Sequence, residues 1–292
     1  MPSSRLALFF LPVVLGSACA MENEFYNKQE TPEPNPEDTA PPVEPPSDLP
    51  IARCSVSPNP VTPPFEAASW DGSASEDPSG GEIVKYEWAL VSQPSGSAVA
   101  LPTNVPGNGA IINNFVPDLA GDYVGRLVVT NDRGDISDPC EVTLEAIPAE
   151  DLWVEMYWTH ASDDMDLHLL KPGGQLETNG DCYFANCVNR SLDWGVRGDE
   201  DDDPSLDLDD IPGTGPENIN ILQPEDGEFT VFVHDYYLSN GWGADYTGAN
   251  QVTVNVYLNG SQVWTNTKPI SGDDTVTPFC RINWQAGTVT SM

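Results

Sequence analysis

Positively charged residues are scarce in this sequence. The 292 residues include 11 Lys and Arg against 46 Asp and Glu, which gives a formal net charge of -35 at pH 7. A field of this sign repels phosphates, so it excludes roles on nucleic acids or on anionic lipid surfaces. Cations are the small partners that such a charge favours. Residues 151–292 carry about -19 of the total and are the most acidic part of the chain.

Long apolar runs and helical periodicity are also missing. The longest apolar run, Leu6–Leu15, is too short to span a bilayer as a helix. The chain instead has short apolar or alternating runs separated by Gly, Pro, Asn and Asp, which is typical of antiparallel β structure. The predicted strands are Ile83–Val91, Tyr123–Thr130, Glu141–Ala146, Leu152–Trp158, Asp166–Leu170, Glu228–Asp235 and Val252–Leu258.

The length and the turn spacing favour two β-sandwich domains over one large barrel. The break falls near Pro148–Asp151, where Pro-Ala-Glu-Asp separates two strand runs. The sequence therefore predicts an all-β protein with one sandwich at 51–148 and a second at 151–292.

Recognised catalytic and zinc-binding motifs are absent. The histidines are His160, His168 and His234, and their spacing matches no zinc motif. G-x-S-x-G and phosphate-binding loops are absent too. Because carboxylates are so abundant in this chain, the presence of two acidic residues does not indicate glycoside hydrolysis. We expect no enzymatic activity and no catalytic residue, with a hydrolase of envelope polymers as an alternative.

Residues 1–20 have the pattern of an export signal, with Arg5 before the apolar run and small residues after it. Small residues that lead into Cys19 resemble the bacterial lipoprotein signal, which implies lipid modification of that cysteine. The motif usually has Leu three places before the cysteine, whereas Leu15 stands four places before it. Cleavage after Ala20 is the alternative. The prediction is an exported protein, lipid-anchored at the outer membrane or cell surface, or else secreted or periplasmic.

Residues 21–50 contain eight prolines and eight acidic residues, with almost no aliphatic ones. Such a stretch cannot bury enough surface to offset its ordering entropy, so it is predicted to be a disordered linker. Proline and charge repulsion favour extension, up to about 90 Å at roughly 3.1 Å per residue. The linker would hold the remaining chain away from the anchor.

Residues 51–148 contain turn and core signals of a sandwich. Asp71 and Asp77 suit turns capped by side chains. Tyr86 and Trp88 alternate on one face of a predicted strand and can fill a core.

The stretch D-G-S-A-S-E-D-P-S-G-G-E-I-V-K-Y-E-W, beginning at Asp71, resembles the polycystic-kidney-disease (PKD) domain. The later F-x-P-D-x-x-G-x-Y pattern of that family is matched by Phe115, Pro117, Asp118, Gly121 and Tyr123. The chain departs from the family by having Trp-Ala-Leu-Val in place of a W-D-F-G-D-G run. The resemblance implies an immunoglobulin-like sandwich that serves as a spacer or an adhesion module.

Six cysteines are present. Cys54 precedes the first candidate strand of the first sandwich and Cys140 opens its last. In an oxidising compartment these strands can lie close enough for a disulfide, which we expect. Cys182 and Cys187 can close a small loop and leave Cys280 unpaired, or Cys280 can bridge to one of them.

Residues 151–292 contain two acidic segments with strand-like alternation. In the first, Asp164, Asp166 and His168 share one face and apolar residues the other. In the second, within 199–210, Asp207 and Asp209 share a face, while the neighbouring leucines point into a core.

Paired carboxylates repel one another unless a cation neutralises them, and calcium accepts six to eight oxygen ligands in flexible geometry. We therefore predict a calcium site, with an ordinary solvated acidic face as the alternative. The predicted ligands are Asp164, Asp166, Asp202, Asp203, Asp207 and Asp209, with Glu217 and Asp235 as outer candidates.

The motifs D-M-D-L-H-L-L-K-P-G-G, D-C-Y-F-A-N-C and D-D-D-P-S-L-D-L-D-D-I-P-G-T-G-P-E-N-I resemble an uncharacterised domain of bacterial exported proteins with a D-x-D-L-H signature. More faintly, their layout is similar to that of the tellurium-resistance calcium-binding β-sandwiches. The first resemblance implies architecture only. The second resemblance implies that this domain binds calcium.

An aromatic cluster follows the Glu228–Asp235 strand: Tyr236, Tyr237, Trp242 and Tyr246. These aromatic residues are typical of packing in a core or at a sheet edge. The alternative is that they lie exposed on a loop and bind a carbohydrate or a protein. As a whole the sequence predicts a non-enzymatic cell-surface adhesion lipoprotein with a calcium-stabilised distal sandwich. Its partner would be a surface protein or a carbohydrate, and a structural envelope spacer is the alternative.

Overall fold

A computed structural model describes residues 49–102, 109–188, 191–210, 213–236, 246, 248–272 and 274–292. The signal segment, Cys19 and nearly all of the predicted linker lie outside these residues. Residues 48–292 form one compact unit. Its described part contains strands and turns, and no helix in it is long and apolar enough to cross a membrane. The all-β prediction is confirmed.

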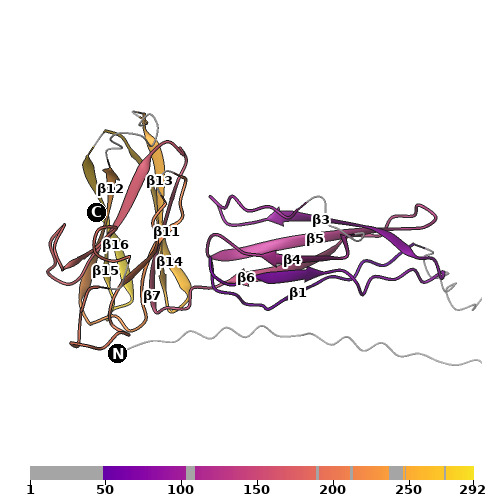
Figure 1. The fold of residues 1–292 in the computed structure, drawn as a ribbon, viewed down its shortest axis with the longest axis horizontal. Helices are drawn as coiled ribbons and strands as arrows, with labels where there is room; N and C mark the ends of the chain where they lie inside the picture. Colours follow the sequence, from indigo (N-terminus) through magenta and orange to yellow (C-terminus); the bar gives the residue numbers. More distant parts are fainter. Residues whose placement is uncertain are drawn as a thin grey trace, which may run out of the picture. The chain divides into compact units, whose positions relative to one another are not determined.

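The first sandwich consists of two three-stranded sheets with the orders β1-β2-β4 and β3-β5-β6 (Figure 1). All pairings between neighbouring strands are antiparallel. The strands are β1 (Ser55–Ser57), β2 (Ala68–Asp71), β3 (Ile83–Ser92), β4 (Ile111–Phe115), β5 (Gly121–Asn131) and β6 (Cys140–Ala146).

Trp70 fills the centre of this sandwich. It is fully buried and makes edge-to-face contacts with Trp88, at 6.0 Å between ring centroids, and with Phe115, at 5.6 Å. Gly125 on the opposite sheet leaves room for the Trp70 ring, because a Cβ there would lie 2.3 Å from it. Trp88 packs against this core as predicted but is itself only half-buried.

Capped turns and a disulfide close the first sandwich. Asp71 accepts a hydrogen bond from the backbone of Ser73, and Asp77 accepts one from the backbone of Ser79. Both turns were predicted. Cys54 and Cys140 form the expected disulfide, with 5.9 Å between their Cα atoms. Disulfides persist in oxidising compartments, which fits an exported chain.

The second sandwich consists of two five-stranded sheets with the orders β10-β11-β7-β13-β14 and β16-β15-β12-β8-β9 (Figure 1). The strands of the first of these sheets are β7 (Leu152–Trp158), β10 (Ser205–Leu208), β11 (Glu217–Ile221), β13 (Asn250–Leu258) and β14 (Ser261–Ile270). Those of the other are β8 (Asp164–Leu170), β9 (Asp181–Cys182), β12 (Glu228–Tyr236), β15 (Thr275–Asn283) and β16 (Thr288–Ser291).

Strand β8 is buried along its whole length. Its apolar face, with Met165, Leu167 and Leu169, belongs to the core of the second sandwich. Its polar face, with Asp166 and His168, is covered as well. A strand covered on both faces normally reads as a continuous apolar run. Packing alone therefore does not explain the polar residues on this covered face of β8.

The seven strands predicted from the sequence agree with β3, β5, β6, β7, β8, β12 and β13 to within two residues at either end. Cys182 pairs with Cys187, and Cys280 is a buried free thiol. This settles the arrangement of cysteines that the sequence left open.

Glu155 on β7 accepts hydrogen bonds from the backbone N–H of Ala120, at 2.9 Å, and from the Asn255 amide, at 3.3 Å. Tyr257 donates its hydroxyl to the Ala120 carbonyl, at 3.3 Å. Glu155 is 2% exposed, and burial is the main cause that raises its pKa to about 7. This carboxyl group is held by residues that belong to both sandwiches.

Candidate metal centre

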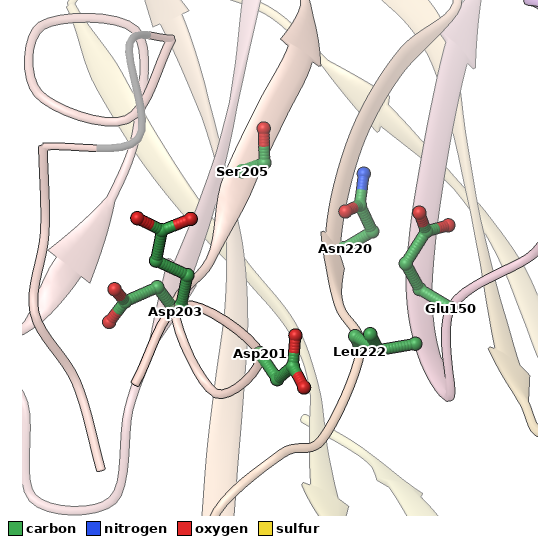
Figure 2. A pocket seen from close by; sticks show the side chains of 7 residues that line it. Glu150, Asp201, Asp203, Ser205, Asn220 and Leu222 are labelled. Carbon is green, nitrogen blue, oxygen red and sulfur yellow. The ribbon is translucent and has the colours of Figure 1, made fainter. Parts of the chain in front are cut away.

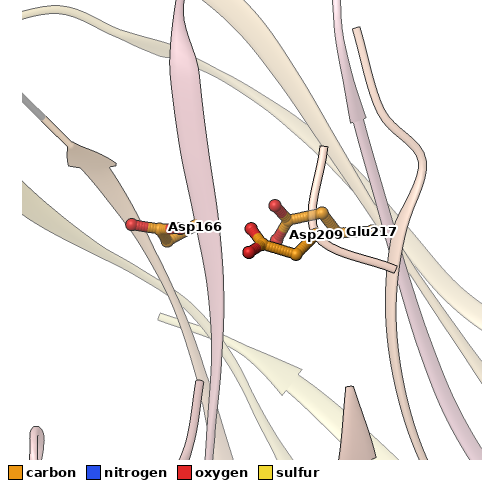
Figure 3. A group of neighbouring side chains, drawn as sticks. All are labelled: Asp166, Asp209 and Glu217. Carbon is orange, nitrogen blue, oxygen red and sulfur yellow. The ribbon is translucent and has the colours of Figure 1, made fainter. Parts of the chain in front are cut away.

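Three carboxylates from three different segments lie near one another at strand β8 (Figure 3). Asp166 lies on β8, Glu217 is the first residue of β11, and Asp209 directly follows β10. One oxygen of each lies within 4.8 Å of the others. Such a set of oxygen atoms can hold a divalent cation.

Glu217 faces inward from β11, on the same side as Ile219 and Ile221, and is fully buried. One of its oxygens accepts the backbone N–H of Leu167, at 2.9 Å, and the other that of Asp210, at 3.4 Å. These bonds fix the carboxylate between the two sheets. Each oxygen keeps a lone pair available for an ion.

Asp166 is the member of this set that has a buried carboxylate oxygen without a hydrogen-bond partner among the described residues. The residue is 2% exposed, and the oxygen concerned is Oδ2. The nearest cationic candidate is His234, whose Nδ1 lies 3.9 Å from that oxygen. A buried carboxylate oxygen without a partner is costly, so this atom is available for a ligand.

The pKa values of all three carboxyl groups are raised. Burial is the largest cause in each case, and the charges of neighbouring carboxylates add to it. For Asp166 the pKa rises to about 8, with Asp164 and Asp209 as the neighbours responsible. Without a cation the Asp166 carboxyl group holds its proton near neutral pH, and a divalent cation would take the place of that proton.

Asp202 and Asp203 were predicted as ligands, but both point into the loop that precedes β10. Asp202 accepts the backbone N–H of Val196, at 2.5 Å, and Asp203 that of Trp194, at 2.6 Å. Neither belongs to the converging set. Their carboxylates cap a turn, a role that Asp commonly has in loops.

Asp207 is also separate from the cluster. It accepts the hydroxyl of Ser205, at 2.6 Å, and the side-chain amides of Asn218, at 3.3 Å, and Asn220, at 2.5 Å. The expected common face of Asp207 and Asp209 fails because β10 has a bulge between Leu206 and Leu208 and ends before Asp209. For the same reason Leu206 is buried but Leu208 only half-buried.

Asp164 and Asp235 are buried but lie outside the cluster. Asp164 acts on it through charge, because it helps to raise the pKa of Asp166. Asp235 stands opposite Met165 in the β12–β8 register, so it shares the face of Met165 rather than that of Asp166. Of the eight predicted ligands, the structure brings together Asp166, Asp209 and Glu217.

The remaining part of the second acidic segment lines a pocket of about 130 Å³ (Figure 2). Asp201 and Asp203 stand on one side of it, and Asn220 and Glu150 on the other. Asp201 is engaged by the Gln223 amide, at 3.0 Å. Leu222 also lines the pocket, which shares no residue with the carboxylate cluster.

Sequence reasoning missed two polar pairs near the cluster. His168 Nδ1 lies 2.7 Å from Asp181 Oδ2, and both residues are buried. Asn250 joins β13 to the loop before β8 by donating to Asp163, at 2.9 Å, and accepting from the backbone of Thr159. Nothing in the spacing of these residues along the chain indicates their contact.

Of the predicted aromatic cluster, Tyr237 and Trp242 lie outside the described residues. Tyr246 stacks on His160, at 3.6 Å between ring centroids. Tyr236 is 40% exposed and contacts Phe184 and His234 edge-to-face. These two tyrosines therefore pack against different partners.

Models of known protein families show no match to this chain, and curated protein sequences show none. The candidate site therefore rests on its own geometry.

Proposed function

We propose that this protein is a non-enzymatic surface-binding lipoprotein, exported by a bacterium, whose distal sandwich is stabilised by calcium bound between Asp166, Asp209 and Glu217. The convergence of these carboxylates carries the proposal, because two of the three are buried and no Lys or Arg among the described residues pairs with them. The PKD-like motif supports an adhesion role. The surface ligand would be a protein or a carbohydrate.

Calcium is favoured over magnesium by the nature of the site. Its oxygen donors come from separate segments and are not held in a rigid octahedron, and calcium tolerates irregular geometry. Asp209 is exposed, so the ion can keep water ligands on that side. Extracellular modules bind calcium with dissociation constants of about 10⁻⁴ to 10⁻³ M.

Calcium at 10 mM is expected to stabilise the protein by about 1.4 to 2.7 kcal/mol, as follows from those dissociation constants. The melting temperature of the second sandwich should rise by several degrees relative to a chelated sample. Scanning calorimetry of the full chain measures the shift. Asp209→Asn should abolish it, since this variant removes an exposed ligand without opening the core.

Asp207→Asn is the matched control, because Asp207 lies in the same acidic segment but bonds to Ser205, Asn218 and Asn220. It should keep the full calcium response. Calcium at this site is ruled out if it does not raise the melting temperature of the wild type. It is also ruled out if it raises the melting temperature of Asp209→Asn by the same amount.

Replacement of Cys19 by alanine is expected to release the protein from the membrane fraction of a bacterium that expresses it, because the proposed anchor depends on that one thiol. Fractionation and immunoblotting measure the distribution. Cys280→Ala is the control and should remain membrane-bound. If Cys19→Ala stays in the membrane fraction, the lipid anchor is wrong and another attachment holds the chain.

A further inference from the structure

Two buried histidines share one face of the β8–β12 strand pair with Asp166. His234 stands directly opposite Asp166 in the antiparallel register, and His168 is two residues further along β8. His168 is 2% exposed and His234 7% exposed. Residues two apart on a strand, and those directly opposite on its neighbour, point to the same face. Two imidazoles and a carboxylate are thus gathered in one buried place.

Each histidine is held by an aspartate at one ring nitrogen. His168 Nδ1 lies 2.7 Å from Asp181 Oδ2, which also accepts the backbone N–H of Glu177. His234 Nε2 lies 3.0 Å from Asp274 Oδ1. A carboxylate at one nitrogen favours the N–H there and leaves the lone pair on the other. This is how proteins orient histidines that bind metals.

The nitrogens that remain are His168 Nε2 and His234 Nδ1. His168 Nε2 is buried and has no hydrogen-bond partner among the described residues. His234 Nδ1 points toward Asp166 Oδ2, from which it is 3.9 Å away, and that oxygen also has no hydrogen-bond partner in the described chain. Unpaired buried acceptors destabilise the folded state, so their persistence points to a ligand that satisfies them.

We propose that His168 Nε2, His234 Nδ1 and Asp166 Oδ2 bind a divalent transition metal of the zinc class. In a tetrahedral site with bonds of about 2.1 Å, ligand atoms lie about 3.4 Å apart and imidazole centres about 5 Å apart. The nitrogen–oxygen distance here is 3.9 Å and the ring centroids of the two histidines are 5.9 Å apart. Binding therefore requires the two imidazole rings to move closer together, since the three proposed ligand atoms do not all lie within 4.8 Å of one another.

Zinc is favoured by the ligand types. Imidazole nitrogen suits Zn²⁺ and its first-row neighbours, whereas calcium and magnesium prefer oxygen. The site shares Asp166 with the proposed calcium cluster but has no other ligand in common with it. The two ions can therefore be separated by substitutions that leave Asp166 in place.

Cobalt titration of the full chain, prepared without a histidine tag and after chelation, tests the proposal. We expect one Co²⁺ per chain with the visible absorption of an imidazole-ligated ion, displaced by Zn²⁺ and retained in excess Ca²⁺. His168→Gln and His234→Gln should each lower the affinity at least 10-fold. His160→Gln is the matched control and should bind cobalt normally, since His160 stacks on Tyr246 instead.

The aspartates that orient the histidines give a second set of variants. Asp181→Asn and Asp274→Asn should weaken cobalt binding about 10- to 100-fold, the usual cost of losing such a partner. The side chain of Asp274 is 80% exposed, so this variant should fold normally. A loss of affinity without a change in melting temperature then identifies Asp274 as a positioning residue.

Asp209→Asn separates the two proposals, because it should remove the calcium response and keep cobalt binding. The inference is overturned if the wild type binds no cobalt, or if cobalt affinity is unchanged in both His234→Gln and Asp274→Asn. Failure of the calcium experiment alone leaves the histidine site standing.

Discussion

Replacement of both Cys54 and Cys140 by alanine is expected to lower the free energy of unfolding of the first sandwich by about 4 to 5 kcal/mol, by the loop-entropy relation. The two cysteines are 86 residues apart in sequence, so the disulfide closes a long loop and strongly restricts the unfolded chain. Denaturant titration followed by the fluorescence of buried Trp70 and its neighbour Trp88 measures the change. A reducing agent added to the wild type should reproduce it.

The double replacement of Cys182 and Cys187 is the matched control. Their separation is 5 residues, so the same relation gives an effect of only about 2 kcal/mol. Similar losses for the two pairs would contradict the loop-entropy explanation. A loss below about 1 kcal/mol for Cys54 and Cys140 would mean that the unfolded state is already compact.

Glu155 is expected to make the protein less stable as pH rises. Its folded-state pKa is raised from 4.5 to about 7, mainly by burial, so the folded protein binds this proton more tightly than the unfolded chain does. The stabilisation is fully present below pH 4.5 and is lost as pH passes through 7. The total change is about 3 kcal/mol, since one pKa unit corresponds to about 1.4 kcal/mol.

Glu155→Gln should flatten this dependence and make the protein more stable than the wild type at pH 8.5. Unfolding free energies measured at a series of pH values test it. Part of the slope should remain, because burial also raises the pKa values of Asp166 and Glu217. Glu87→Gln is the control, because the Glu87 side chain is 52% exposed. This variant should leave the slope of unfolding free energy against pH unchanged. An unaltered slope in Glu155→Gln would show that this carboxyl group titrates normally.

The sequence predicted those strands that have a buried apolar pattern of their own. Strand β7 is bounded by polar turns and is apolar along most of its length, so its limits agree with the prediction. Strand β14 has an exposed, mostly polar pattern and contains Pro269, and it was missed. As an edge strand it takes part in one pairing, which polar residues tolerate.

The candidate sites were only partly predictable, for a related reason. Alternation correctly placed Asp166 and His168 on one face of β8, because that information is local. The contact of Asp166 with Glu217 depends on how two sheets meet, and the bulge in β10 removed Asp207 from the group. His234 lies opposite Asp166 only through the register of β12. The spacing of these residues along the chain indicates neither the contact between the sheets, nor the bulge, nor the register.

The position of the Cys54–Cys140 bond also matters when the chain is pulled. Cys54 lies just before β1, and Cys140 opens β6, the last strand before the second sandwich. A mechanical load applied between the N-terminal segment and β7 would pass through the sulfur atoms and bypass residues 55–139. Most of the first sandwich would then stay folded under tension, and only the short stretches on either side of the bond would lengthen.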